Sequence, residues 1–368
     1  MKFTCSQAIL SKAINTVSKA VSVRTTIPIL KGILLSVKNG RLTLSASDLD
    51  MSIETTIDVQ NSEDGNSVVS AKLFGEIIRK LPNTLVTAYK DDNNQFNINC
   101  VGSNFNIISL PSEEFPVIKG IESKNFIEIK KENFINLIKK TAFAASIDEK
   151  KGILTGTLLN FEKNNLEMVA LDGFRMAVAK DEIETGLEKK IVVPAKILNE
   201  VNKILQEEDG DTLSLLVDDK KIEIRTEDTV VIARLLEGDF IKYNDIIPVS
   251  YKTRMVVGRE DILNSIERAS LLAKEGKNNL IKITLENGNV NIASRSDEGN
   301  VNEHVSAEVE GENIVIGFNS KYLIDVLKAV EDEEIAFEMG TSVSACILKS
   351  VDSDKYTYLV LPVRITAA

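Results

Sequence analysis

The chain has 368 residues and a formal net charge of −11, from 44 basic and 55 acidic side chains. Hydrophobic residues make up 43% and charged residues 27% of the chain, a composition that excludes a largely disordered protein. No apolar run approaches the ~18 to 20 residues that span a bilayer, and the amino end lacks the apolar core of a signal peptide, so we expect a cytoplasmic protein without a membrane partner.

Six stretches have apolar residues spaced three and four positions apart, the pattern of amphipathic helices. In chain order we predict helices over residues 6–20, 71–81, 131–145, 195–207, 259–274 and 320–330. Between them apolar and polar residues alternate, as around Leu42, Leu44 and Ala46, which is typical of half-buried strands. Asn-Gly or Asp-Gly pairs predict turns at residues 39–40, 209–210 and 287–288. We therefore expect an α+β fold.

Two segments recur three times in the same order, at a period of 124 to 125 residues. One reads VVSAKLFGEIIRKL, IVVPAKILNEVNKIL and IVIGFNSKYLIDVLKAV, and the other reads NGRLTLSASDLDMSI, NNLEMVALDGFRMAV and NGNVNIASRSDEGNV. A unit of this length can bury a core of its own. We predict three tandem domains, each of two helices packed on antiparallel sheet, over residues 1–122, 123–247 and 248–368.

Basic residues are concentrated in the predicted helices. Alone, the negative net charge argues against nucleic acid as a partner, but the six helices carry 15 basic and 8 acidic residues, a net charge of +7, which leaves −18 for the rest. Cations seven residues apart, two turns along one face, recur at Lys12/Lys19, Lys72/Arg79, Lys196/Lys203 and Lys321/Lys328. This segregation favours binding of a polyanion, although lysines that only keep helix surfaces soluble would give a similar count.

The chain has no recognisable catalytic motif. It lacks a Walker loop and the GxGxxG, GxSxG and HExxH patterns. Asp48, Asp172 and Asp297 fall at equivalent places in the three repeats, and we interpret them as turn residues because an enzyme rarely needs its catalytic acid in triplicate.

Cysteines and histidine predict no metal site. Cys5, Cys100 and Cys346 lie in apolar, strand-like sequence, and we expect reduced thiols in the core. His304 has no second histidine or CxxC pair to complete a set of ligands. We expect neither a metal nor a cofactor.

Four segments give a specific combination: TIPILKGILLSVKNGRLTLSASDLDMSI near the amino end, LDGFRMAV, GFNSKYLIDVLKAV and the final YTYLVLPVRI. With the three repeats, they resemble the bacterial DNA polymerase III beta subunit family, the sliding clamps, over residues 1–365. The resemblance implies a head-to-tail homodimer whose six domains close into a ring around duplex DNA. Twelve helices, with about +14 in total, would then line the hole. It also implies a processivity factor rather than an enzyme.

The resemblance implies partners and site residues. The partners are double-stranded DNA, the DNA polymerase III alpha subunit, the clamp loader, and other polymerases and repair proteins that carry clamp-binding peptides. DNA would be held without sequence preference by Lys and Arg on flexible stems, namely Arg24, the best match to the family's DNA contacts, with Lys12, Lys72, Arg79, Lys196 and Lys203. The peptides would insert into an apolar pocket of Leu154, Leu171, Gly173, Phe174, Arg175, Met176, Ile241, Ile246, Leu361, Pro362, Val363 and Arg364.

Several positions depart from the family's pattern. Phe174 stands where a histidine or tyrosine is often found, Ile241 where proline is common and Asp245 where some members carry arginine, so the family's peptide preference does not carry over. Residues 366–368 extend beyond the family's usual hydrophobic end.

For the dimer contact, the resemblance implies Phe105 of one chain against Leu271 and Leu272 of the other. Two other classes of protein stay open on the sequence: an enzyme, and a scaffold that binds proteins and never meets DNA.

Overall fold

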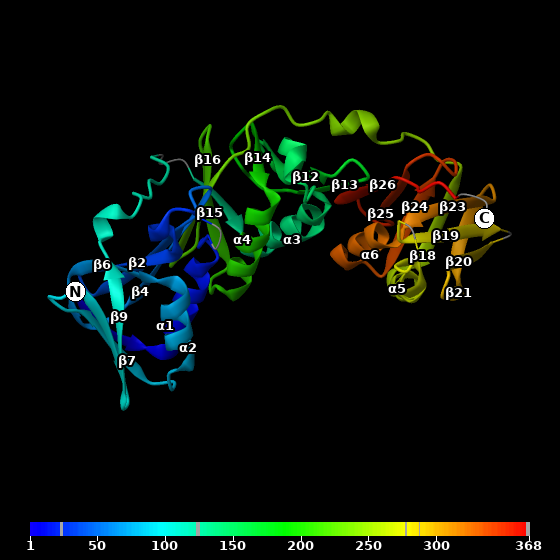
Figure 1. The fold of residues 1–368 in the computed structure, drawn as a ribbon. Helices are drawn as coiled ribbons and strands as arrows, with labels where there is room; N and C mark the ends of the chain where they lie inside the picture. Colours follow the sequence, from blue (N-terminus) through cyan, green and yellow to red (C-terminus); the bar gives the residue numbers. More distant parts are fainter. Residues whose placement is uncertain (23–24, 123–125, 277, 287, 366–368) are drawn as a thin grey trace. The chain divides into compact units, whose positions relative to one another are not determined.

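The computed structural model describes residues 1–22, 25–122, 126–276, 278–286 and 288–365. Within these ranges the chain forms six α-helices and 26 strands, and every strand pair that the structure records is antiparallel (Figure 1). The predicted α+β class is confirmed. None of the helices in the described ranges is long and apolar enough to cross a membrane.

All six predicted helices are present. They are α1 (Gln7–Ser18), α2 (Ala71–Lys80), α3 (Lys131–Thr141), α4 (Ala195–Glu207), α5 (Arg259–Ala273) and α6 (Ser320–Ala329). The α3 helix is shorter than predicted because the 3-10 turn η3 (Ala142–Ala144) takes over its last residues. Further 3-10 turns are η1 (Pro28–Lys31), η2 (Ser112–Glu114), η4 (Glu149–Thr155) and η5 (Tyr243–Ile246).

The strands follow the repeats. In the first third of the chain they are β1 (Lys2–Ser6), β2 (Gly32–Lys38), β3 (Arg41–Ser47), β4 (Met51–Asp58), β5 (Gln60–Glu63), β6 (Gly65–Ser70), β7 (Leu85–Lys90), β8 (Gln95–Cys100) and β9 (Ser103–Leu110). The middle third has β10 (Ile127–Lys130), β11 (Gly156–Glu162), β12 (Asn165–Leu171), β13 (Arg175–Asp181), β14 (Lys189–Pro194), β15 (Thr212–Val217), β16 (Lys221–Arg225) and β17 (Thr229–Arg234). The last third has β18 (Thr253–Gly258), β19 (Leu280–Glu286), β20 (Asn289–Ser296), β21 (Gly299–Val305), β22 (Ala307–Gly311), β23 (Ile314–Asn319), β24 (Glu334–Met339), β25 (Cys346–Ser350) and β26 (Tyr356–Val360).

One order of elements occurs three times. Each repeat reads strand, helix, four strands, helix, three strands, with β5 added in the first copy and β22 in the third. In Figure 1 the colours run with the sequence, from blue in the first copy to orange and red in the third. The threefold repetition found in the sequence is therefore a repetition of structure.

The described chain forms two compact units that divide the second repeat between them. The first contains residues 1–132 and 200–235, and the second residues 133–199 and 236–368. These divisions concern compactness and do not test the domain boundaries after residues 122 and 247, which stay predictions.

In the first unit, one sheet runs through strands of two repeats. Its order is β10-β15-β16-β17-β4-β3-β2-β6-β9-β8-β7-β1-β5, and β17 joins β4 in register from Thr229 opposite Thr55. The two threonine hydroxyls lie 3.0 Å apart and are buried. Beneath α1 and α2 the core includes an edge-to-face pair of Phe74 and Phe96, with ring centroids 5.7 Å apart. Strand pairing thus joins neighbouring repeats.

The segment that leads into β10 is fixed by a buried carboxylate. Glu223 of β16 accepts a hydrogen bond from the backbone N–H of Ile121 at 2.7 Å, and Arg225 pairs with its other oxygen. Lys221 Nζ donates to the Lys119 carbonyl at 3.0 Å. A connection without helix or strand is therefore held against the sheet by side-chain bonds.

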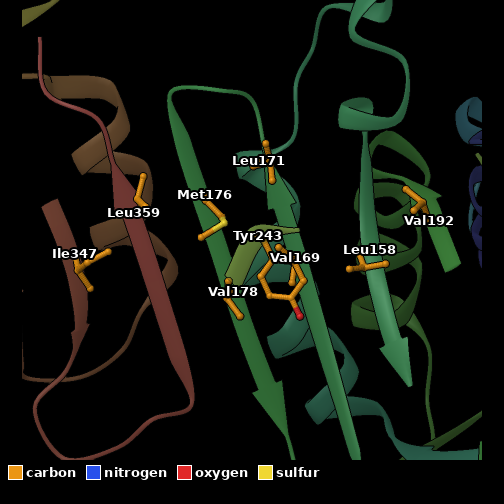
Figure 2. Close-up of a cluster of buried hydrophobic side chains, with 9 residues drawn as sticks. All are labelled: Leu158, Val169, Leu171, Met176, Val178, Val192, Tyr243, Ile347 and Leu359. Atoms are coloured by element: carbon orange, nitrogen blue, oxygen red, sulfur yellow. The ribbon is translucent and has the colours of Figure 1, made fainter. Parts of the chain in front are cut away.

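The second unit has two sheets. Their orders are β14-β11-β12-β13-β26-β25-β24-β18-β22 and β21-β20-β19-β23, and β13 of the second repeat pairs with β26 of the third. Figure 2 shows side chains from the six successive strands β14 to β25 of the larger sheet, with the ring of Tyr243 among them. Tyr243 donates its hydroxyl to Glu167, and burial is the main cause that raises the pKa of this phenol. The connection through η5 is thereby fixed to the sheet.

Candidate functional sites

Three of the cations predicted to bind DNA border one groove between α1 and α2. Lys12 comes from α1, and Lys72 and Arg79 come from α2, at a hollow of about 530 Å³. Gly75 lets the helices approach closely, because a Cβ there would lie 3.3 Å from Cγ2 of Ile14. The structure brings these three cations together, as their positions on the two helices required.

The cations of the first repeat differ in their partners. Lys72 and Arg79 form no ion pair with any described residue, and Lys12 Nζ lies 3.8 Å from Oδ2 of the fully exposed Asp209. Lys19, the C-cap residue of α1, is less available: its side chain is only 12% exposed, and its Nζ lies 3.3 Å from Glu207 Oε2. Arg24 lies outside the described residues.

The other two predicted DNA contacts lie on α4. Lys196 is exposed and has no ion pair within the described ranges, whereas Lys203 Nζ lies 2.7 Å from Glu200 Oε1 on the same helix. Such an exposed pair holds its lysine only weakly. Both side chains therefore stay available at the surface.

The hairpin between β12 and β13 presents Phe174 to solvent. Gly173 has φ of +92°, a conformation that favours glycine, and Asp172 Oδ1 accepts from the backbone N–H groups of Phe174 and Arg175 at 2.8 and 3.0 Å. Asp48 makes the same turn in the first repeat, with Asp50 and Met51 as donors. The interpretation of Asp48 and Asp172 as turn residues is confirmed. In the described part of the third repeat, the Asp297 side chain accepts no such bond, and Ser296 Oγ instead accepts from the backbone N–H of Glu298.

Arg175 points inward, where it connects three segments. Its Nε lies 3.1 Å from Asp172 Oδ2, its Nη1 lies 2.5 Å from Asp325 Oδ2 of α6, and its Nη2 donates to the Phe143 carbonyl at 2.7 Å. The side chain is 9% exposed. Within the predicted pocket, Arg175 is thus a buried support that orders the groups around it.

Phe174 is held between an aromatic ring and a cation. Its ring is 54% exposed and stacks on Tyr322 of α6, with centroids 6.4 Å apart and planes 19° apart. Lys151 Nζ lies 5.2 Å from the Phe174 centroid and donates to the Asp172 carbonyl at 2.6 Å. Burial, followed by the charge of Asp172, raises the pKa of Tyr322, so its hydroxyl stays protonated at neutral pH.

Sequence reasoning did not include Lys151, Tyr322 or Asp325 in the pocket. Arg175 and Asp325 are 150 positions apart, and no local pattern links them. The one available signal was that Tyr322 and Asp325 lie one turn apart in the repeated helix segment.

The carboxyl-terminal segment passes beside the same hairpin. Leu361 donates its backbone N–H to the Phe174 carbonyl at 2.9 Å, and Val363 donates to the Gly317 carbonyl at 2.8 Å. A Cβ on Gly317 would lie 2.6 Å from the Val363 carbonyl oxygen, so glycine is required for this approach. Leu361 and Arg364 remain exposed, whereas Pro362 and Val363 are half-buried. Residues 366–368 lie outside the described ranges.

The remaining pocket residues divide between core and surface. Leu171 and Met176 are buried in the cluster of Figure 2, and Leu154 packs against it. Ile241 and Ile246 are exposed on the connection around η5, and Ile241 borders a hollow of about 440 Å³ that Tyr243 also lines. Asp245 is exposed and lines the same hollow. Ile241 therefore shares a hollow with Leu158 and Val192 of the buried cluster. Phe174, Ile246 and Leu361 are the other exposed apolar side chains of the predicted pocket.

The residues predicted for the dimer contact are exposed in their own units. Phe105 on β9 is exposed, and Ile108 of the same strand is more so. Leu271 on α5 is 65% exposed, and Leu272 is half-buried. Apolar side chains on an exposed strand and an exposed helix face are suited to a contact with a second chain.

The predicted core thiols are confirmed. Cys5, Cys100 and Cys346 are free and buried. His304 is exposed on β21. Among the described residues, no group of three or more His, Cys, Asp or Glu could hold a metal ion.

Family profiles match nearly the whole chain. The DNA polymerase III beta subunit N-terminal domain matches residues 1–119, its central domain residues 128–242 and its C-terminal domain residues 244–364. A beta sliding clamp from Staphylococcus epidermidis is 35% identical over 375 residues, which cover 99% of each chain.

Solved structures agree in fold over the same length. The DNA polymerase sliding clamp from Bacillus subtilis has a TM-score of 0.94 and 32% identity, with 100% of both chains covered. The DNA polymerase III beta subunit from Thermotoga maritima has a TM-score of 0.93 and 30% identity, covering 99% of this chain and 100% of that one.

Proposed function

Because the chain belongs to the DNA polymerase III beta subunit family, we propose that it closes around duplex DNA as a head-to-tail homodimeric ring and tethers replication proteins there. It is a sliding clamp and contributes processivity rather than catalysis. Its three domains would extend over residues 1–122, 123–247 and 248–368. A cytoplasmic location accords with this role and with the three free thiols.

The observation that carries the DNA proposal is the groove between α1 and α2. Lys12, Lys72 and Arg79 meet there without a strong ion pair among the described residues. Flexible cations attract phosphates but do not read base edges, so a ring lined by them can move along the duplex. Lys196, Lys203 and Arg24 would add to this surface.

The peptide proposal rests on the apolar surface around Phe174. Phe174, Ile241, Ile246 and Leu361 are exposed, Ile241 lines a hollow with Leu158 and Val192 of the buried cluster, and Lys151 and Tyr322 contact the Phe174 ring. Apolar anchors of a short peptide bind at such sites, where rigid groups exclude water. The partners would be the DNA polymerase III alpha subunit, the clamp loader, and other polymerases and repair proteins with clamp-binding peptides.

Retention on circular DNA tests the ring. The chain is loaded by its clamp loader onto a nicked circular duplex, washed at high salt and counted before and after the circle is cut. A ring stays on the closed circle, because salt screens phosphate contacts but cannot open a closed protein, and it leaves when the DNA becomes linear. A protein scaffold that never meets DNA would show no dependence on topology, and this result would refute the proposal.

Substitution of Phe174 tests the pocket. In a fluorescence anisotropy titration with a labelled carboxyl-terminal peptide of the DNA polymerase III alpha subunit, F174A should weaken binding by about tenfold or more, as expected for loss of an aromatic ring that the peptide's anchors would cover. L85A removes a similarly exposed apolar side chain from β7 of the first unit and should bind normally. Equal affinities for F174A and L85A would show that the peptide binds elsewhere.

A further inference from the structure

We infer that phosphate binding is unequal among the repeats: the first helix pair, α1 and α2, presents free cations to the DNA backbone, whereas the third pair, α5 and α6, neutralises its own. This inference rests on the proposed DNA encirclement and specifies which helices carry it. The ligand is the phosphodiester backbone of duplex DNA.

The charges of the two helix pairs differ. Within their bounds, α1 and α2 contain four basic residues and one acidic residue, Glu76, whereas α5 and α6 contain four basic and four acidic residues. The spacing of the helix cations repeats, but the net charge differs: it is +3 in the first pair and zero in the third.

The carboxylates of the third repeat are placed against its cations. Lys328 of α6 lies 2.6 Å from Glu267 of α5, across the pair. Arg268 Nε donates to Glu303 of β21 at 3.0 Å, and Arg268 Nη2 lies 3.0 Å from Ser265 Oγ. The hydrogen bond from Arg268 lowers the pKa of Glu303, so this partner stays ionised at neutral pH.

The guanidinium of Arg259, at the start of α5, also has partners. Its Nε donates to the Asp332 carbonyl at 3.0 Å, and its Nη2 lies 3.1 Å from Glu260. Of the four basic residues on α5 and α6, Lys321 alone has no ion pair with another described residue. A phosphate that approaches this pair therefore meets three cations whose charge is already compensated and one, Lys321, that is not.

The first pair lacks such compensation. Lys72 and Arg79 line the groove without an ion pair among the described residues, and Lys12 has only the fully exposed Asp209 at 3.8 Å. Ser11 and Asn15 of α1 line the same groove and offer neutral donors to phosphate oxygens. The electrostatic attraction of the duplex is therefore stronger at the first helix pair than at the third.

The test measures the salt dependence of DNA binding. Each protein binds a fluorescein-labelled linear duplex of random sequence, and the apparent association constant is followed by anisotropy over a series of NaCl concentrations. Each phosphate contact contributes about 0.9 to the slope of log K against log salt. Thermal melts check that each variant is folded.

Opposite changes are expected in the two repeats. K72Q/R79Q should make the slope shallower, reducing its magnitude by about two. E267Q/E303Q should raise both the affinity and the slope, because Lys328 and Arg268 lose their partners. The control K38Q/K220Q removes the same charge as the first variant from exposed positions outside the helices and should change the slope little.

Two results would overturn the inference: K72Q/R79Q indistinguishable from K38Q/K220Q, or E267Q/E303Q indistinguishable from the wild type. Retention of the wild type on closed circles is independent of both. If retention persists while the variants behave alike, the unequal distribution is wrong and the ring stands; if retention fails, the proposed function itself fails.

Discussion

Arg175 shows how one residue can have a structural role at a predicted binding site. Its guanidinium joins Asp172 on the β12–β13 hairpin to Asp325 on α6 and to the Phe143 carbonyl. Its planar fork supplies several donors in fixed directions, which a lysine cannot do. The position of the Phe174 surface therefore depends on this buried side chain.

Loss of the Arg175 side chain should be strongly destabilising. R175A leaves two carboxylates without their partner, and we expect a loss of about 3–5 kcal/mol in the free energy of unfolding. R175K should recover only part of this, because lysine keeps the charge but not the fork. Urea denaturation measures both, with R41A as the control, since Arg41 is exposed and 3.7 Å from an exposed Asp58. An R175A protein as stable as R41A would contradict the structural role.

Cys5 makes a pH-dependent contribution. Burial raises the pKa of its thiol from 9.0 to about 12. The folded chain thus holds this proton more tightly than the unfolded chain, and the resulting stability is complete below pH 9 and is lost as the pH rises towards 12.

The stability difference between wild type and C5A should therefore shrink at alkaline pH. From about pH 8 to about pH 10, we expect this stability difference to fall by roughly 1.4 kcal/mol, which corresponds to one pKa unit. Urea midpoints of both proteins measure this, because other alkaline titrations affect the two alike. A difference that stays constant over this range would show that the thiol ionises freely in the folded chain.

At the scale of elements, the ends of the helices differ in how they are capped. Asn319 precedes α6, and its side chain accepts from the backbone N–H of Lys321 at 3.0 Å. Ser6 precedes α1, but its hydroxyl caps no backbone N–H of that helix. Asparagine and serine both favour the N-cap position, but only Asn319 accepts a hydrogen bond from a backbone N–H of its helix.

The difference between the two caps can be measured. N319A should lower the free energy of unfolding by about 1 kcal/mol, because a backbone donor of α6 loses its acceptor. S6A should change it by less than about 0.5 kcal/mol. Equal losses for the two variants in urea denaturation would mean that the bond at Asn319 contributes nothing.

The elements themselves follow from local pattern. Apolar spacing predicted all six helices, and the turn at residues 39–40 is confirmed by positive φ at Asn39 and Gly40. The local pattern placed the end of α1 at residue 20, whereas the helix ends at Ser18. It also did not predict the contact of Lys19 with Glu207, because these residues are 188 positions apart in the chain.

At the scale of the whole molecule, two of the open strand edges belong to β9 and β21. Among the described residues, β9 pairs with β6 only at Ser109 and Leu110, so its residues 103–108 are free on that side, and β21 ends the smaller sheet of the second unit. Open edges are available for pairing with another chain. Phe105 on β9 and Leu271 on α5 place exposed apolar side chains near these elements.

Truncation of the two leucines on α5 should weaken the homodimer. L271A/L272A removes apolar surface from the proposed contact, and we expect the dissociation constant to rise at least about tenfold. Sedimentation equilibrium over a concentration series gives the molar mass, starting from 40.6 kDa for one chain. V343A, with an exposed apolar side chain on another loop, is the control. An unchanged dimer in L271A/L272A would exclude this contact.

The sequence by itself determined the helices, the α+β class, the threefold repeat and the excess of cations on helices, because these properties lie in local periodicity and composition. Only the tertiary structure decided which cations are free. Lys19 and Lys328 carry the same charge as Lys72, yet Glu207 and Glu267 compensate the first two. It also joined Arg175 to Asp325 and β4 to β17. Such contacts depend on packing between residues far apart in the chain, which no local spacing encodes.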